Sequence, residues 1–157
     1  MTAQLDKKLL LLHFKMQDTL ACINLKNIEK ILLLPSLEEV PGGPVYMVGL
    51  MNLHGQSVTV IDLLTLIGIK REKSYSLETP LLICSENSIK IAVVVDEVLE
   101  LMETEEKVLQ YDDKINAKNS PFMAIVPYQS KLSYLININR ILGSEMIKEK
   151  QRVLEET

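Results

Sequence analysis

The sequence predicts a mostly β protein whose antiparallel strands form barrels. Short apolar segments bounded by turn residues recur along the chain, about four or five before a polar interval at 69–78 and about five after it. No helical pattern between them is long enough to connect parallel strands. Hydrophobic residues make up 47% of the 157 residues, but only 4% are aromatic and there is no Trp. Leu, Ile and Val must therefore fill the interior, which favours β-sheet.

The first predicted elements are a hairpin, a helical turn and a third strand. Residues 9–14 and 19–23 are apolar segments separated by polar residues, which suits a hairpin. Asn24 can cap a single helical turn before the strand at 28–34, which a proline stops. The loop that follows, at 36–44, is rich in Pro, Gly and acidic or hydroxyl residues.

The stretch at 48–66 predicts a second hairpin followed by a short helix. An apolar run leads to His54 and Gly55, a turn in which Gly can take positive φ, and the run after the turn alternates polar and apolar residues. Asp62 can then cap a helix of one or two turns, which Gly68 would end.

The second half predicts further strands and a closing helix. One hairpin is expected at 79–84 with 89–95, and another at 122–128 with 132–137. Between them, residues 98–102 should form a short strand or a bend. A helical turn should follow at 138–142. Sparse apolar residues among charged ones beyond Gly143 predict a surface helix at the C-terminus.

Charge and hydropathy exclude several classes of partner. The formal net charge is −4 at pH 7, and no cluster of Lys and Arg is long enough to follow a nucleic-acid backbone. No apolar run approaches the ~20 residues of a membrane-spanning helix, and no secretory signal pattern is present. We therefore expect a cytoplasmic protein without nucleic-acid partners or direct membrane insertion. Cys22 and Cys84 should be small buried hydrophobes, with a disulfide between them as the less favoured alternative.

No group of residues predicts catalysis, a metal site or a cofactor. His54 lies on a turn beside Asn52, but the nearby hydroxyls are on a regular strand with no strained elbow to activate a nucleophile. Neither His has a partner at metal-ligand spacing, and no glycine-rich phosphate loop precedes a helix. Asp62 and Asp96 each follow an apolar strand and are predicted to cap the segment that comes next. We therefore predict that the protein is not an enzyme.

Two motifs resemble those of the CheW-like domain of bacterial chemosensory adaptors. The first combines Gly49 with N-L-x-G at 52–55 and I-D-L at 61–63, and the second is V-V-D-x-V at 94–98. They occur in the family's order and spacing, and the two together are specific, whereas either alone is only a strand followed by Asp. The resemblance extends over roughly residues 9–143.

The resemblance implies a fold of two small five-stranded antiparallel β-barrels that share a core, with short helices. It implies one CheW-like domain over residues 1–157. The expected parts are a first barrel at about 9–68, a polar linker at about 69–78, a second barrel at about 79–137 and a C-terminal helical segment at 138–157. Closure into barrels would leave few free sheet edges.

The resemblance also implies a non-enzymatic adaptor that joins a chemoreceptor's cytoplasmic tip to the regulatory domain of a CheA-type histidine kinase. Such a protein is cytoplasmic, free or recruited to membrane receptor arrays. The residues that match the family's kinase-binding face are Gly49, Leu50 and Met51. Those that match the receptor-binding side are Ile28, Lys30, Asn52, His54, Val94 and Val95.

Two residues depart from the family pattern where partner contacts are expected. His54 replaces the usual arginine, and so exchanges a permanently charged fork for an imidazole, while Lys30 replaces a usual glutamate. We expect this pair to mark altered partner specificity. The alternative functions are a divergent CheW-like module of another sensory pathway, such as twitching motility, or a competitor of the adaptor. A small-molecule-binding β-barrel is the less favoured third alternative.

Overall fold

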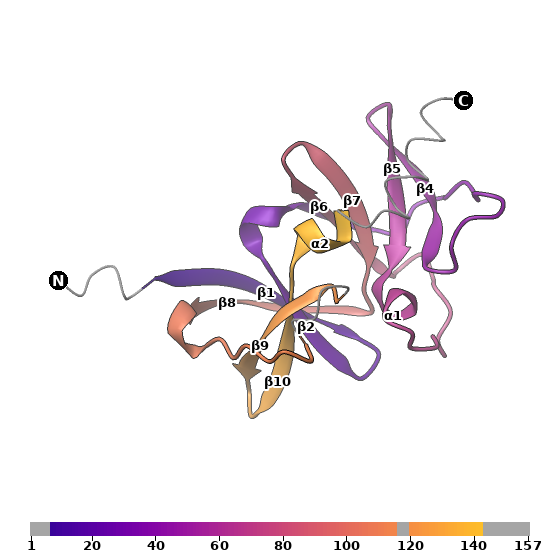
Figure 1. Cartoon of the computed structure of the whole chain (residues 1–157). Coiled ribbons are helices and arrows are strands. Elements are labelled where there is room, and N and C mark those ends of the chain that lie inside the picture. Colours follow the sequence, from indigo (N-terminus) through magenta and orange to yellow (C-terminus); the bar gives the residue numbers. More distant parts are fainter. Residues whose placement is uncertain (1–6, 116–119, 143–157) are drawn as a thin grey trace.

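The computed structural model describes residues 7–115 and 120–142 of the chain and contains two five-stranded sheets (Figure 1). The mostly β fold predicted from the sequence is confirmed. Its helices are short, as expected: η2 (Leu25–Asn27), α1 (Leu63–Leu66), η3 (Glu106–Val108) and α2 (Ile138–Leu142). The surface helix predicted beyond Gly143 lies outside the described residues.

The first sheet has the strand order β8-β1-β2-β10-β9. Neighbouring strands pair antiparallel, except that β2 and β10 run parallel. Its strands are β1 (Lys8–Met16), β2 (Thr19–Asn24), β8 (Glu97–Glu105), β9 (Phe122–Tyr128) and β10 (Lys131–Ile136).

The second sheet has the strand order β3-β6-β7-β5-β4. Its one parallel pair is β5 with β7. Its strands are β3 (Ile28–Leu33), β4 (Met47–Leu53), β5 (Gln56–Asp62), β6 (Pro80–Glu86) and β7 (Ile89–Val94). All four predicted hairpins are therefore present, two in each sheet.

The strands are not divided between the sheets at the linker, which corrects the predicted barrel boundaries of about 9–68 and 79–137. The first sheet takes β1 and β2 from the N-terminal half, and the second takes β6 and β7 from the C-terminal half. Each sheet also contains one parallel pair, where the sequence predicts antiparallel pairing throughout. The physical reason is that turn residues determine each hairpin locally, whereas the neighbours of a hairpin depend on apolar faces that meet only in the folded chain.

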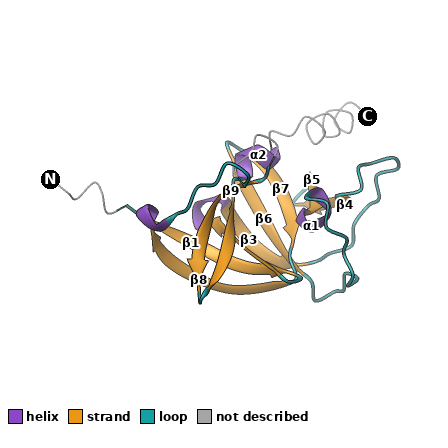
Figure 2. Ribbon diagram, turned by 60° about the horizontal axis from the view of Figure 1, so that its bottom comes forward, coloured by secondary structure: helices purple, strands orange, loops and turns teal. Residues whose placement is uncertain are grey.

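Neither sheet closes into a barrel through the pairing of its described strands, but one bridge joins the two edges of each. Glu38, which follows β3, exchanges backbone hydrogen bonds of 2.8 and 2.9 Å with Leu50 of β4. Gln110, which follows β8, makes bonds of the same lengths with Ile125 of β9. Figure 2 shows the strands bending across the molecule, with α2 over the ends of β7 and β9. Each sheet thus retains a barrel-like enclosure.

Three apolar cores lie against the two sheets. A shared core lies between the sheets and includes Phe14 of the first sheet and Leu82 of the second, which confirms the predicted common core. Each sheet also buries its other face in a core of its own. Because alternate residues of a strand point to opposite faces, β7 directs Val93 to the shared core and Ala92 and Val94 to the core of its own sheet. This double burial explains why the apolar runs of β6 and β7 are continuous instead of alternating.

Gly49 of β4 is buried beneath the segment that bridges the edges of the second sheet. A Cβ atom at this position would lie 2.7 Å from the carbonyl oxygen of Glu38 and 3.1 Å from the Cβ atom of Leu37. A real Cβ atom essentially never lies 2.7 Å from a backbone oxygen, so a glycine is needed for the bridging segment to pack at this distance.

We expect Gly49→Ala to lower the free energy of unfolding by about 1–3 kcal/mol, because the added methyl group meets backbone atoms that cannot rotate away. Ser57→Ala, at an exposed position of the adjacent strand, should change it by less than about 0.5 kcal/mol. Urea unfolding followed by circular dichroism measures both. Equal stability of the two variants would show that the bridging segment moves aside without cost.

Candidate functional site

Asp62 at the end of β5 caps α1, as the sequence predicts. Its Oδ1 atom accepts a hydrogen bond of 3.0 Å from the backbone N–H of Leu64. The side chain is only 1% exposed. A carboxylate this deeply buried is stable only if other donors or a cation compensate for its lost hydration.

Arg71, from the polar linker, provides that compensation. Its Nε atom lies 2.5 Å from Oδ2 of Asp62, and its Nη1 atom lies 2.7 Å from Oδ1 of Asp96. The hydroxyl of Tyr75 also donates to Asp62, at 2.5 Å. Burial by itself raises the pKa of Asp62, but the hydrogen bonds from Arg71 and Tyr75 and the positive charge outweigh burial and hold that pKa below its ordinary value.

The parallel pairing of β5 and β7 brings the two aspartates together. Asp62 lies opposite Val94 in that pairing. Asp96 follows Val94 by two residues, so both aspartates lie at the same end of the paired strands. Asp96 does not cap the segment after it, which corrects the prediction. Its Oδ2 atom instead accepts a 2.6 Å hydrogen bond from the backbone N–H of Gln17, in the turn between β1 and β2. The Arg71 cluster, Asp62, Arg71 and Asp96, therefore ties a turn of the first sheet to a strand end of the second.

The side chain of Gln17 adds to this connection. Its Oε1 atom accepts a 2.6 Å hydrogen bond from the backbone N–H of Glu72, and its Nε2 atom donates to the carbonyl oxygen of Lys70 at 3.4 Å. Sequence reasoning missed Arg71, because it is one of three cations close together in the linker and nothing local distinguishes it from the other two. The available signal was that two strands end in aspartates, which need a cation if they are buried.

His54 lies on the exposed turn between β4 and β5, far along β5 from Asp62. His54 and Gly55 have φ values of +53° and +85°, and Oδ1 of Asn52 accepts a 2.7 Å hydrogen bond from the N–H of Gly55. Asn52 thus holds the turn that presents the imidazole. The Nε2 atom of His54 lies 3.5 Å from Nζ of Lys30 on β3. The structure therefore brings together the two residues that depart from the family pattern, and no carboxylate within residues 7–115 and 120–142 pairs with His54.

β3 is an edge strand that exposes apolar side chains. Among the described strands it pairs only with β6. Ile31 lies opposite Leu82, a member of the shared core, so Ile31 and Leu33 continue the face of that core toward solvent. They are 46% and 62% exposed. We call Ile28, Lys30, Ile31, Leu33 and His54 the β3 edge surface.

Several residues predicted to contact partners are inside the protein instead. Val94 and Val95 are fully buried, and Gly49 and Met51 are also buried, because successive residues of these strands enter two different cores. Leu50 is half-buried. Of the predicted receptor-side residues, only Lys30, Asn52 and His54 are exposed, and Ile28 is half-buried. Sequence reasoning missed Ile31 and Leu33, whose exposure depends on β3 being an edge strand.

The remaining titratable side chains in the interior have structural partners. His13 on β1 is buried, its Nδ1 atom lies 3.0 Å from Oγ of Ser133, and its ring stacks on that of Tyr128. Burial lowers the pKa of His13, and this effect exceeds that of the negative charge of Glu100, which raises it. Cys22 and Cys84 are buried free thiols, as predicted, and burial raises the pKa of each to about 12. They belong to different cores.

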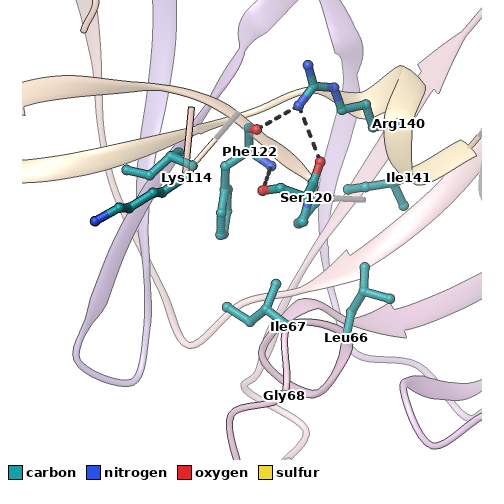
Figure 3. A pocket seen from close by; sticks show the side chains of 10 residues that line it. Leu66, Ile67, Gly68, Lys114, Ser120, Phe122, Arg140 and Ile141 are labelled. Atoms are coloured by element: carbon teal, nitrogen blue, oxygen red, sulfur yellow. Dashed lines mark hydrogen bonds between the residues drawn. The ribbon is translucent and has the colours of Figure 1, made fainter. Parts of the chain in front are cut away.

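A pocket of about 610 Å³ opens between α1, α2 and the start of β9 (Figure 3). Its polar groups do not converge. The guanidinium of Arg140 donates to the carbonyl oxygens of Phe122, at 3.0 Å, and Ser120, at 3.5 Å, and Figure 3 shows the ammonium of Lys114 on the other side of Phe122. The size suits a small molecule, but the lining lacks the directed polar groups of a specific site.

The described residues contain neither a metal-binding group nor a membrane-spanning helix. In 7–115 and 120–142, no group of three or more His, Cys, Asp or Glu side chains is placed to hold a metal ion. No helix in those ranges is long and apolar enough to cross a membrane.

Comparison with known proteins gives a consistent result. The model of the CheW-like domain family matches residues 10–146. The chain is 22% identical over 107 residues to a probable chemotaxis protein CheW of Rhizobium etli, with 68% of each chain covered. The crystal structure of the scaffolding protein TtCheW from Thermoanaerobacter tengcongensis has the same fold, with a TM-score of 0.74 at 20% identity. That match covers 83% of this chain and 90% of the other.

We expect Arg71→Met to lower the free energy of unfolding by about 3–5 kcal/mol at pH 7, because it leaves two carboxylates, one fully buried, without their cation. Lys70→Met removes the same charge from the neighbouring exposed residue and should change stability by less than about 0.5 kcal/mol. Urea unfolding of both variants measures the difference.

The effect of Arg71→Met should also depend on pH. Since the folded protein holds the pKa of Asp62 below its ordinary value of about 3.9, the stabilisation is fully present above that value. It is lost as the pH falls through the lower pKa of the folded state. The stability gap between the unchanged protein and Arg71→Met should therefore shrink below about pH 4. A gap that stays constant down to about pH 2 would contradict this role of Asp62.

Proposed function

Because the chain belongs to the CheW-like domain family, we propose that it is a non-enzymatic adaptor that couples a chemoreceptor's cytoplasmic tip to a CheA-type histidine kinase. The family comprises scaffold and adaptor proteins of chemotaxis signalling. In this proposal the protein works in the cytoplasm and is recruited to membrane receptor arrays by its partners. It binds both partners without carrying out a reaction.

The β3 edge surface is the observation that carries the proposal. Exposed Ile31 and Leu33 present apolar area on an unpaired edge, beside the charged Lys30. An amphipathic helix binds such a surface by burying its apolar residues and keeping its charged residues at the rim. The family implies that the receptor tip is a hairpin; in this proposal the hairpin presents such a helix, so we assign it to this surface. Ile31 and Leu33 take the place that Val94 and Val95 have in the sequence-based hypothesis.

We place the kinase regulatory domain at the outer edge of the second sheet, on β4 and the segment that bridges to it. Leu50 and Leu37 are half-buried there and can each contribute apolar contact. Gly49 acts indirectly in this proposal, because it lets Leu37 and Glu38 pack against β4. A partner at this edge and a partner at the β3 edge surface would touch opposite edge strands of one sheet.

A second candidate function is supported by the pair formed by Lys30 and His54. Both side chains are exposed and differ from the family pattern, which fits a divergent module that serves another sensory pathway or competes with an adaptor. Such a protein would have the same two binding surfaces with different partners. The two candidates are separated by which receptor and kinase the protein binds.

We expect Leu33→Ser to weaken binding of a chemoreceptor tip hairpin by about tenfold, because it removes an exposed apolar contact worth about 1.4 kcal/mol at an interface. Leu132→Ser is the matched control, since Leu132 is a similarly exposed leucine on β10 of the other sheet. Titration calorimetry with the purified hairpin measures the affinities. Equal affinity of the two variants would show that the receptor does not bind at the β3 edge surface. If the protein binds neither receptor nor kinase, the proposed function is wrong.

A further inference from the structure

Lys30 and His54 form a positively charged spot that no described carboxylate neutralises. Their side-chain nitrogens are 3.5 Å apart, and neither side chain makes an ion pair with an acidic residue in the part of the chain that the structure describes. The nearest carboxylate along β3 is that of Glu29, which pairs with Lys90 at 3.2 Å. This spot carries positive charge on a chain whose formal net charge is −4.

The backbone positions of both residues are defined by pairing and turn contacts. Lys30 lies within β3, opposite Ile83 of β6. His54 lies on a tight turn that the side chain of Asn52 closes with a 2.7 Å hydrogen bond to Gly55. β3 and β4 are opposite edges of the second sheet, so the contact forms where the curled sheet brings its edges together. The pair is thus presented by a paired strand and a hydrogen-bonded turn.

We infer that this pair binds a carboxylate of the partner, an Asp or Glu side chain that the receptor tip places beside its apolar contacts with Ile31 and Leu33. The inference rests on the proposed function. One carboxylate oxygen would accept from Nζ of Lys30 and the other from the imidazole N–H of His54, since a carboxylate has two oxygens that can accept from adjacent donors. Charge-assisted hydrogen bonds of this kind are stronger than neutral ones.

The same pair would reject a partner that presents a basic residue at this point. Like charges that face each other across an interface cost several kcal/mol, whereas a well-placed carboxylate is attracted. Lys30 is on the face of β3 opposite to that of Ile31 and Leu33, so a helix lying along the strand edge can touch both features. The apolar contacts then supply affinity and the charged spot selects the partner.

The test uses the full chain and the purified cytoplasmic tip hairpin of a chemoreceptor from the same organism. Lys30→Met should weaken binding by about three- to tenfold, and Lys30→Glu by more than about tenfold. Lys26→Met, which removes the same charge from exposed η2, is the matched control and should leave the affinity unchanged. Each Asp and Glu of the hairpin is changed in turn to Lys, and one of these hairpins should bind Lys30→Glu better than it binds the unchanged protein.

The outcomes separate this inference from the proposed function. If the unchanged protein binds no receptor tip, the proposed function fails and the inference falls with it. If the tip binds but Lys30→Met and Lys26→Met have equal affinities, or no charge reversal on the hairpin restores binding to Lys30→Glu, only the inference is overturned. Urea unfolding of each variant confirms that any loss of binding occurs in a folded protein.

Discussion

The structure depends on burying both faces of its inner strands. β6 and β7 send alternate residues into the shared core and into the core of their own sheet, so neither strand has a face toward solvent. Contacts with other proteins are thereby restricted to turns and to edge strands. This is why Val95, although part of a motif that resembles the family's partner-binding region, is fully buried, and why the edge strand β3 exposes Ile31 and Leu33.

The double burial also creates the need for the Arg71 cluster. The parallel strands β5 and β7 both finish at the same end of the sheet, and there the chain leaves a fully apolar environment. Asp62 and Asp96 provide hydrogen-bond acceptors where the chain leaves these two strands, and the guanidinium of Arg71 neutralises the charge of both carboxylates. Through Gln17 the same cluster holds a turn of the other sheet, so it adds a polar connection between the two sheets to their shared apolar core. Electrostatics thus completes an arrangement that apolar packing begins.

The sequence predicted those features that are determined locally. The turn at His54 and Gly55, the cap at Asp62 and the four hairpins depend on neighbouring residues and were found. The pairing of β1 with β8 and the choice of Arg71 over Lys70 depend on residues that meet only after folding, and no local pattern marks them. The candidate site was predictable in part for the same reason. Lys30 and His54 stand out by their chemical type, whereas the exposure of Leu33 follows from strand order.

The interleaved strand order has a consequence for how the chain folds as it is synthesised. All strands of the second sheet lie between Ile28 and Val94, so this sheet can assemble once that part of the chain has left the ribosome. β1 and β2 are made first, but β1 pairs with β8 and β2 with β10, which emerge much later. The N-terminal hairpin must therefore wait beside a nearly finished domain, and these long-range pairings should set the slow step of folding. When β8 finally pairs with β1 it becomes the edge strand of the first sheet, and the four glutamates among its nine residues then oppose pairing of that edge with another chain.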